Sequence, residues 1–315
     1  MDGRAGGRRG GVVVIAILSR KRSLYSTRRL LESAAGLGHE TCVLDPLQCH
    51  LVLSARSPAI LYRRLDGRLP EIGVVLPRIG ASITELGLAV VNQFDMMGVP
   101  LVNNSQPIAR SRDKLRCLQL LSRADVDIPR TVMVRHPSQV HQALEIVGGP
   151  PAILKLERGT QGIGVILAET EQVMQQVLET FWSLGMNILV QQFIEESEGR
   201  DVRALVVGSK VLAAMRRQAR LGEFRSNVHR GGTGVAVDLP EEYKRAALRA
   251  TRVMGLQVAG VDMLESRGGP KVMEINSSPG FEGLERCSGV DVAGAIIRYA
   301  VAFARRKARP GRAAI

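Results

Sequence analysis

The sequence predicts an α/β protein, in which an N-terminal parallel α/β domain precedes two lobes that mix helices with antiparallel strands. Short apolar runs rich in branched residues alternate with helical segments over residues 12–106, which is the pattern of a parallel sheet. Further along the chain, tight glycine turns join paired runs such as Arg200–Val207 and Val211–Arg216, and these predict hairpins. The 315 residues are enough to bury the cores of two or three lobes.

The composition is that of a globular enzyme with a basic surface. Hydrophobic residues make up 45% of the chain and charged residues 23%, while the net charge is +13. A positive excess suits a polyanionic partner such as a nucleotide, an acidic peptide or RNA. Aromatic residues are only 3% of the chain, which argues against a protein that stacks bases, so no sequence-specific nucleic acid is expected. The basic ends, residues 1–11 and 306–315, are predicted to be disordered tails.

The cysteines and the first apolar run indicate a cytoplasmic protein with no membrane partner. The four cysteines are scattered without a CxxC pair, which fits reduced thiols better than disulfides or a zinc site. Val12–Leu18 is too short to span a membrane, and basic residues follow it too abruptly for a signal peptide. We interpret this run as the first buried strand.

The predicted N-terminal domain, residues 12–106, contains four strands and two helices. The strands are Val12–Leu18, Glu40–Leu44, Val74–Pro77 and Leu101–Val102, and the helices are Thr27–Leu37 and Ile83–Met97. The polar segment that continues from Asp45 to Pro70 is expected to be rich in loops. Ser19–Ser23 does not match the fingerprint GxGxxG after the first strand, so a dehydrogenase lacks its main support.

Residues 107–190 are predicted to form a central lobe around a glycine-rich hairpin. The expected helices are Ile108–Ala124, Ser138–Val147 and Glu171–Leu184, and the expected strands are Thr131–Val134, Ala152–Leu156, Val165–Ala168 and Asn187–Phe193. Lys155 interrupts the apolar strand just before the turn Arg158–Gly164, and a buried lysine costs free energy unless it meets an anion. The turn is either an ordinary hairpin turn or a flexible loop whose N–H groups cover a bound phosphate, and the neighbouring Lys155 favours the second interpretation.

Residues 191–305 are predicted to form a C-terminal lobe that contains a basic segment and a closing hairpin. The remaining expected elements are the helices Pro240–Met254 and Val290–Arg305. Arg216–Gly232 is basic and polar without an amphipathic period, which usually means a solvated loop. Its mixed donors, which include Arg225, Asn227 and His229, instead favour binding of carboxylate and phosphate oxygens. His229 fits either a general base or a structural role.

The segment Val258–Gly280 predicts a strand hairpin that carries a metal site. If the hairpin is symmetric about Gly268, Asp262 lies opposite Glu274, with the Cβ atoms ~5 Å apart. Asn276 lies two residues beyond Glu274 and therefore on the same face. Two facing carboxylates repel each other unless a cation lies between them, and hard oxygen donors suit Mg²⁺ or Mn²⁺.

Together these motifs resemble the ATP-grasp ligases, and most closely the RimK-type α-L-glutamate ligases. The resemblance covers residues 12–305 and rests on Lys155, the turn GTQGIG, the strand VQQF, and the set Asp262, Glu274 and Asn276. IAILSRKRSLYS, IARSRDKL, KLERGTQGIGVILAE, FRSNVHRGG and VAGVDMLE also look like that group. The fold it implies is a pre-ATP-grasp domain followed by a two-lobed ATP-grasp fold.

The resemblance also implies roles for individual residues. ATP would be bound by Lys114, Lys155, Gly159, Gly162, Gly164, Gln192, Phe193, Asp201, Arg225, Ser226 and Asn227. The residues expected to serve the reaction are Arg203, Arg225, Asn227 and His229, and those expected to hold two Mg²⁺ or Mn²⁺ ions are Asp262, Glu274 and Asn276.

The implied activity is ATP-dependent addition of L-glutamate to the C-terminal tail of ribosomal protein bS6, or to another acidic acceptor, through an acyl phosphate. The resemblance implies a homo-oligomer, a tetramer. One alternative is a ligase of the same chemistry that acts on a small molecule or on free poly-glutamate. An alternative of another class is a non-catalytic basic protein that binds RNA or the ribosome, which the intact metal set disfavours.

Overall fold

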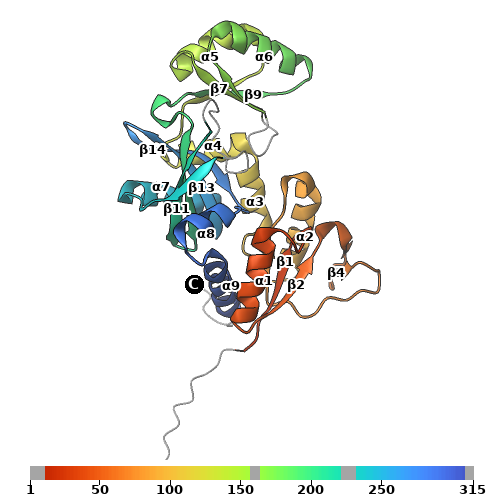
Figure 1. Ribbon diagram of the computed structural model, residues 1–315. Helices are drawn as coiled ribbons and strands as arrows, with labels where there is room; N and C mark the ends of the chain where they lie inside the picture. Colours follow the sequence, from red (N-terminus) through yellow and green to blue (C-terminus); the bar gives the residue numbers. More distant parts are fainter. Residues whose placement is uncertain (1–10, 157–163, 221–231, 309–315) are drawn as a thin grey trace, which may run out of the picture. The chain divides into compact units, whose positions relative to one another are not determined.

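A computed structural model describes residues 11–156, 164–220 and 232–308 of the chain (Figure 1). These residues fall into two compact units. Unit 1 comprises the described residues up to Val102 together with those from Ala293 onward, and unit 2 runs from Asn103 to Val292. The last helix, α9 (Val292–Lys307), thus lies almost entirely in unit 1, whereas the sequence places this segment in the C-terminal lobe.

Unit 1 is built on a parallel sheet, as predicted. Its strands are β1 (Val14–Leu18), β2 (Glu40–Leu44) and β5 (Val74–Pro77), in the order β2-β1-β5. Its other helices are α1 (Tyr25–Gly36) and α2 (Thr84–Met96). Leu101, expected in a fourth strand, makes only an isolated parallel bridge to Val75. The strands β1 and β5 are almost completely buried, which explains why their apolar runs were clear in the sequence, whereas the edge strand β2 is fully buried only at Leu44.

The segment up to Pro70, expected to be rich in loops, also contains a hairpin that the sequence did not predict. Its strands are β3 (Cys49–Val52) and β4 (Ala59–Tyr62), which pair antiparallel. The buried Gln93 on α2 donates from Nε2 to the carbonyl oxygens of Val52 at 3.0 Å and Ala59 at 3.3 Å. This anchor depends on a residue distant in sequence, so the local polar pattern did not indicate it.

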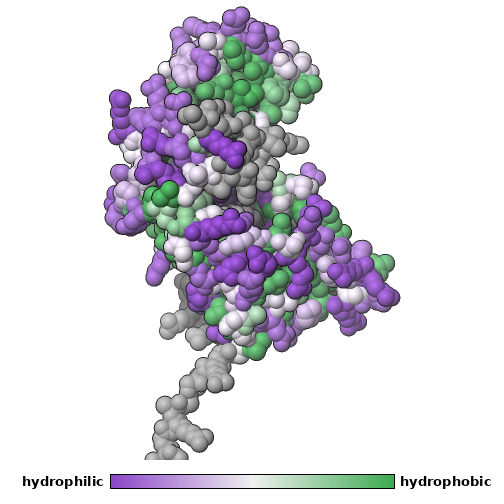
Figure 2. Space-filling view, viewed as in Figure 1, coloured by the Kyte–Doolittle hydropathy of each residue, from purple (hydrophilic) through white to green (hydrophobic). Residues whose placement is uncertain are grey.

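Unit 2 contains two antiparallel sheets. The four-stranded sheet has the order β6-β9-β7-β8, and its strands are β6 (Thr131–Val134), β7 (Ala152–Leu156), β8 (Val165–Ala168) and β9 (Ile188–Gln192). Helices α5 (Val140–Val147) and α6 (Glu171–Ser183) cover one face of this sheet (Figure 1). Figure 2 shows hydrophobic colouring on part of this lobe, beside hydrophilic colouring. Val173 and Trp182 are exposed large side chains of α6.

The five-stranded sheet has the order β12-β11-β10-β13-β14. Its strands are β10 (Arg200–Val207), β11 (Lys210–Gln218), β12 (Thr233–Ala236), β13 (Val258–Ser266) and β14 (Gly269–Asn276). Helices α4 (Lys114–Arg123) and α7 (Glu241–Met254) pack their apolar side chains against one face of this sheet. The alternating residues of the strands therefore point toward the opposite face, where the predicted site lies.

Three local predictions in unit 2 are wrong. The helix expected over Ile108–Ala124 is divided into α3 (Ser105–Arg112) and α4, because Asp113 has an extended backbone and its carboxylate caps α4 by accepting from the Arg116 amide at 2.8 Å. Arg217 and Gln218, expected in the basic loop, extend the predicted strand Val211–Arg216 and belong to β11. The short strand β12 and the helix α8 (Glu282–Ser288) were not expected.

Helix length and composition provide one further observation. In the three described stretches, no single helix is long and apolar enough to cross a membrane, and the bent pair α8 and α9 passes only on length and composition.

Candidate functional site

The β13–β14 hairpin places Asp262 directly opposite Glu274, as predicted. The pairing results from two features that the prediction did not contain. The turn pairs Ser266 with Gly269, and a regular ladder from that turn would place Met273 opposite Asp262. A β-bulge shifts the register at this point, so that Val272 pairs with Met263 and Glu274 pairs with Asp262.

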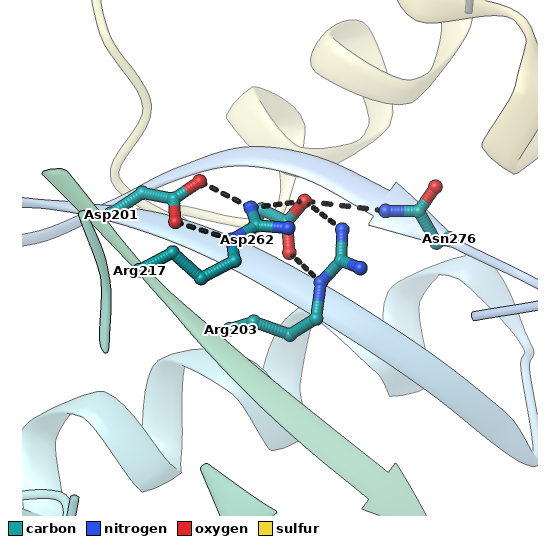
Figure 3. A network of polar contacts seen from close by, with 5 residues as sticks. All are labelled: Asp201, Arg203, Arg217, Asp262 and Asn276. Atoms are coloured by element: carbon teal, nitrogen blue, oxygen red, sulfur yellow. Dashed lines mark hydrogen bonds and ion pairs between the residues drawn. The ribbon is translucent and has the colours of Figure 1, made fainter. Parts of the chain in front are cut away.

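Asp262 is held by two arginines on neighbouring strands (Figure 3). Arg203 binds it bidentately, with Nε and Nη2 each 2.6 Å from a carboxylate oxygen. Arg217 Nη2 lies 3.0 Å from Asp262 Oδ2, and Asn276 donates from Nδ2 to the same oxygen at 3.4 Å. These contacts follow from the register, because Arg203 pairs with Asp262 across β10 and β13.

Arg217 also binds Asp201, which lies beside it on β10. Arg217 Nε donates to Asp201 Oδ1 at 2.6 Å, and Nη2 makes a second contact with Oδ2. Asp201, Arg217 and Asp262 are each no more than 2% exposed. In this structure both oxygens of Asp201 are occupied by Arg217, so the contact of Asp201 with a ribose stays a prediction.

The arginines change the electrostatic argument made from the sequence. A cation between Asp262 and Glu274 was expected to offset their repulsion, but Arg203 and Arg217 already neutralise Asp262. Burial alone would raise the pKa of Asp262, yet these two guanidinium groups outweigh it and lower that pKa. Burial opposes the charge on Arg217, but Asp262 and Asp201 together raise the pKa of Arg217, so it stays protonated.

Glu274 is the carboxylate of this site that lacks such a partner. It makes no hydrogen bond or ion pair with another residue in the described part of the chain. Its side chain still reaches solvent, yet the protein atoms crowded around it and the charge of Asp262 raise the pKa of Glu274. Lys155 opposes this shift. A carboxylate in this position would gain from a cation.

The donor set fits a divalent metal ion of the magnesium type. Asp262, Glu274 and Asn276 bring two carboxylates and an amide to one face of the sheet, and hard oxygen donors are what Mg²⁺ prefers. Within residues 11–156, 164–220 and 232–308, no three residues of the types His, Cys, Asp and Glu form a metal site. Coordination would therefore depend on the amide oxygen of Asn276 as well as on the two carboxylates.

Two lysines, Lys155 and Lys114, lie close enough to Glu274 to lower its pKa. Lys155 is on β7, on the face away from α5 and α6, with Leu189 and Val165 as its strand partners. Burial lowers the pKa of Lys155 to about 8, and the charge of Lys114 adds to this shift. Lys114, the first residue of α4, donates from Nζ to the Leu156 carbonyl oxygen at 2.8 Å. Two crowded ammonium groups suit a ligand with several negative charges.

The strand expected to lie along an adenine ends at Gln192. The backbone amide of Gln192 donates to the Arg130 carbonyl oxygen at 2.8 Å. The side-chain oxygen of Gln192 accepts from the backbone amide of Arg130 at 3.4 Å. Phe193 follows and is half-buried. The side chain buried beside them is Gln191, which donates to the Thr131 hydroxyl at 2.9 Å. The adenine contact of Gln192 and Phe193 stays a prediction.

Gly164 closes the glycine-rich turn and needs to be glycine. Its φ of +76° lies in the left-handed region, and an added Cβ would lie 2.7 Å from Leu156 Cδ1. Its carbonyl oxygen accepts from the Leu156 amide at 2.9 Å, which continues the pairing of β7 and β8. The other predicted residues of the turns and loops lie outside the described residues: Gly159, Gly162, Arg225, Ser226, Asn227 and His229.

Asn103 and Arg217 are the important site residues that sequence reasoning missed. Asn103 is 1% exposed and bonds both ends of the hairpin, donating from Nδ2 to the carbonyl oxygens of Val258 at 2.8 Å and Ser277 at 3.0 Å. Its Oδ1 accepts from the amides of Gln257 at 2.6 Å and Val258 at 3.0 Å. The only signal in the sequence was a polar residue directly after the buried Leu101–Val102.

Family models and relatives agree with this fold. A RimK-like ATP-grasp domain matches residues 111–300, and a RimK PreATP-grasp domain matches residues 13–108. A probable alpha-L-glutamate ligase of Vibrio vulnificus (strain YJ016) is 52% identical over 285 residues, which cover 90% of this chain and 94% of the relative. Another, from Marinomonas sp. (strain MWYL1), is 51% identical over 286 residues, with coverage of 90% and 94%.

Solved structures share the fold at low sequence identity. The ATP-grasp ligase PsnB, complexed with a minimal precursor, superposes with a TM-score of 0.73 at 22% identity, covering 93% of this chain and 99% of PsnB. A RimK domain protein of Sphaerobacter thermophilus DSM 20745 has a TM-score of 0.68 at 23% identity, with coverage of 92% and 100%.

The fold, the family models and the named relatives together define an ATP-dependent carboxylate–amine ligase of the ATP-grasp type. The chain belongs to the RimK family of ATP-grasp ligases, alongside the curated probable alpha-L-glutamate ligases.

Proposed function

We propose that this protein adds L-glutamate to the C-terminal carboxylate of an acidic acceptor peptide, and that the tail of ribosomal protein bS6 is such an acceptor. The observation that carries the proposal is the 52% identity to probable alpha-L-glutamate ligases over 90% of the chain. The ATP-grasp ligase PsnB was solved in complex with a precursor peptide, which is consistent with a peptide acceptor here. The basic composition also suits a tail that gains a carboxylate with each addition.

The proposed reaction has two steps. First, an acceptor carboxylate oxygen attacks the γ-phosphorus of ATP, the bond to the bridging oxygen breaks, and ADP leaves with an acyl phosphate formed. Second, the amine nitrogen of L-glutamate attacks the acyl carbon, the bond to the phosphate oxygen breaks, and the nitrogen loses a proton. No protein nucleophile is required, because positioning and charge stabilisation account for catalysis.

The described residues suit these steps as follows. Lys155 and Lys114 would bind phosphate oxygens, and Arg203 would hold Asp262 in place while presenting its remaining N–H groups to the site. Asp262, Glu274 and Asn276 would hold two Mg²⁺ or Mn²⁺ ions, which would supply positive charge to the phosphate oxygens. A structure of PsnB was solved with Mg and ADP, which supports Mg²⁺ and an adenine nucleotide as the ligands bound here.

The residues expected from the family resemblance complete the proposed site. Gly159, Gly162 and Gly164 would cover the phosphates, Gln192 and Phe193 would line the adenine, and Asp201 would lie on the ribose side. Arg225, Ser226, Asn227 and His229 would bind the reacting carboxylate and phosphate. We propose a cytoplasmic homo-oligomer, a tetramer, and the free cysteines Cys42, Cys49, Cys117 and Cys287 suit a reducing compartment.

A mass-spectrometric assay tests the acceptor. The protein is incubated with ATP, Mg²⁺, L-glutamate and bS6, and a ladder of glutamate additions at the bS6 C-terminus is expected. Glu274→Ala should give no ladder, whereas Glu265→Gln, on the same hairpin but in an exposed ion pair with Arg216, should retain it. A ladder on glutamate alone or on a small molecule, with none on bS6, would favour the alternative ligase. RNA binding without any glutamate-dependent ATP hydrolysis would instead favour the non-catalytic alternative.

A further inference from the structure

The parallel sheet of unit 1 has a topological switch point at the carboxyl ends of its strands, and the proposed catalytic residues belong to unit 2 instead. In the order β2-β1-β5, the chain leaves β1 through α1 toward β2 on one side, and β5 joins β1 on the other. The strand order therefore reverses between β1 and β5. In open α/β sheets, ligands bind beyond the carboxyl ends of the strands at such a switch point.

The loops at this edge are rich in unneutralised positive charge. Arg20, Lys21 and Arg22 follow β1 and are exposed, and none of them forms an ion pair or side-chain hydrogen bond with a described residue. Between Ser19 and Leu31 there is no acidic residue. Arg28 and Arg29 differ, because they share Glu32 at 3.3 and 3.0 Å.

The neighbouring strand adds a fourth cation to the same edge. Arg78 follows β5, and its amide donates to the carbonyl oxygen of Leu18 at 2.9 Å, which places it next to the start of the 19–24 loop. No acidic residue lies between Arg78 and Thr84. Burial lowers the pKa of Arg78 to about 10, which leaves it charged at neutral pH. Figure 2 shows mostly hydrophilic colouring over the part of unit 1 where Figure 1 draws α1.

The start of α1 reinforces the positive potential. This helix has 12 residues, no acidic residue in its first turn and no side-chain cap at Leu24. Its first amide groups and its dipole therefore add to the charge of the loop. The side chains carry three separate charges on consecutive residues, which matches a ligand with several carboxylates spaced along a chain better than a single small anion.

We propose that Arg20, Lys21, Arg22 and Arg78 form a docking surface for the carboxylate-rich stretch of the acceptor that precedes its reacting end. This proposal rests on the proposed function and adds to it a second contact with the acceptor, made by residues of unit 1. Each glutamate added gives the surface another carboxylate to bind. The acceptor should therefore bind more tightly as it grows, until the surface is filled.

The test compares two triple variants of equal charge. Arg20→Gln/Lys21→Gln/Arg22→Gln removes the docking charges, and Arg63→Gln/Arg64→Gln/Arg68→Gln removes three exposed arginines from the β3–β4 region of the same unit. Binding of a fluorescent peptide with a C-terminal run of glutamates is measured by anisotropy, alongside the KM values for that peptide and for ATP. The first variant should weaken peptide binding and raise the peptide KM roughly tenfold, with a smaller salt dependence and little change in the ATP KM.

Each other outcome overturns the proposal in a recognisable way. Equal weakening in both variants would mean that net charge alone acts. A raised ATP KM with unchanged peptide binding would assign the surface to nucleotide phosphates, and loss of RNA binding with unchanged peptide binding would assign it to RNA. If wild type transfers glutamate and the first variant still binds the peptide as tightly, only the docking surface is wrong. If wild type transfers no glutamate to any acceptor, the proposed function itself fails.

Discussion

Arg217 and Asp262 form an ion pair of 3.0 Å between side chains that are each 3% exposed. The same guanidinium group binds Asp201, so one buried arginine connects β10, β11 and β13 beneath the proposed metal site. Asp201 and Asp262 are both buried, so water cannot take the place of Arg217 as their hydrogen-bond partner. The stability of the site and the orientation of Asp262 therefore depend on Arg217.

Replacing Arg217 should destabilise the protein far more than replacing its neighbour. Arg217→Ala leaves two buried carboxylates with too few partners, and we expect a loss of ~3–5 kcal/mol in the free energy of unfolding. Arg216→Ala breaks an ion pair with Glu265 in which Arg216 is 47% exposed, and should cost under ~1 kcal/mol. Urea unfolding of both variants checks this. Similar losses from both substitutions would show that the buried network contributes little.

Replacing Glu274 should remove turnover and leave stability intact. Its carboxylate is repelled by Asp262 and has no arginine partner among the described residues, so Glu274→Ala should unfold within ~1 kcal/mol of wild type. Glutamate-dependent ADP release should fall at least ~100-fold, the scale of removing one preorganised charge contact. A variant that retains turnover would eliminate Glu274 as a metal ligand, and Glu265→Gln is the control on the same hairpin.

The lowered pKa of Lys155 predicts a stability that rises in alkali. Lysine has a pKa of 10.5 when unperturbed, and burial lowers that of Lys155 to about 8 in the folded chain. Between these pH values the unfolded chain holds a proton that the folded chain has lost, so raising the pH increases the free energy of unfolding, by up to ~3 kcal/mol. Below pH 8 Lys155 is charged in both the folded and the unfolded chain, and the burial of this charge lowers the free energy of unfolding.

Comparison of two variants isolates this effect from other groups that titrate in alkali. Lys155→Met should remove the rise between pH 8 and 10.5, whereas Lys210→Met, an exposed lysine at the start of β11, should retain it. Denaturant unfolding at a series of pH values provides the measurement. The prediction fails if the wild-type and Lys155→Met curves run parallel across this window.

The sequence predicted most strands of both units, because these are largely apolar runs, and it predicted the pairing of Asp262 with Glu274. It did not predict β3, β4 or β12. That pairing was predicted from a hairpin symmetric about Gly268. The turn is in fact centred between Arg267 and Gly268, and the extra residue of the bulge, Met273, restores the pairing of Asp262 with Glu274. The local sequence could not predict the roles of residues that depend on contacts between strands. Arg217 looked like part of a basic loop, and only the register with Asp201 shows it as buried.

The last prediction concerns Asn103, which the sequence did not distinguish from Asn104. Asn103→Ala would leave two amides and two carbonyl oxygens at the base of the hairpin without their partner, at roughly 0.5–1 kcal/mol each, for a total of ~2–4 kcal/mol. Asn103→Asp keeps the acceptor for Gln257 and Val258 but sets a carboxylate oxygen against two carbonyls, so it should not recover the loss. Asn104→Ala, at an exposed position, should cost under ~0.5 kcal/mol. Amide exchange at Val258 should accelerate in both Asn103 variants and not in Asn104→Ala, because Val258 donates to Asn103 Oδ1. Unchanged protection at Val258 in Asn103→Ala would show that water replaces this side chain without loss.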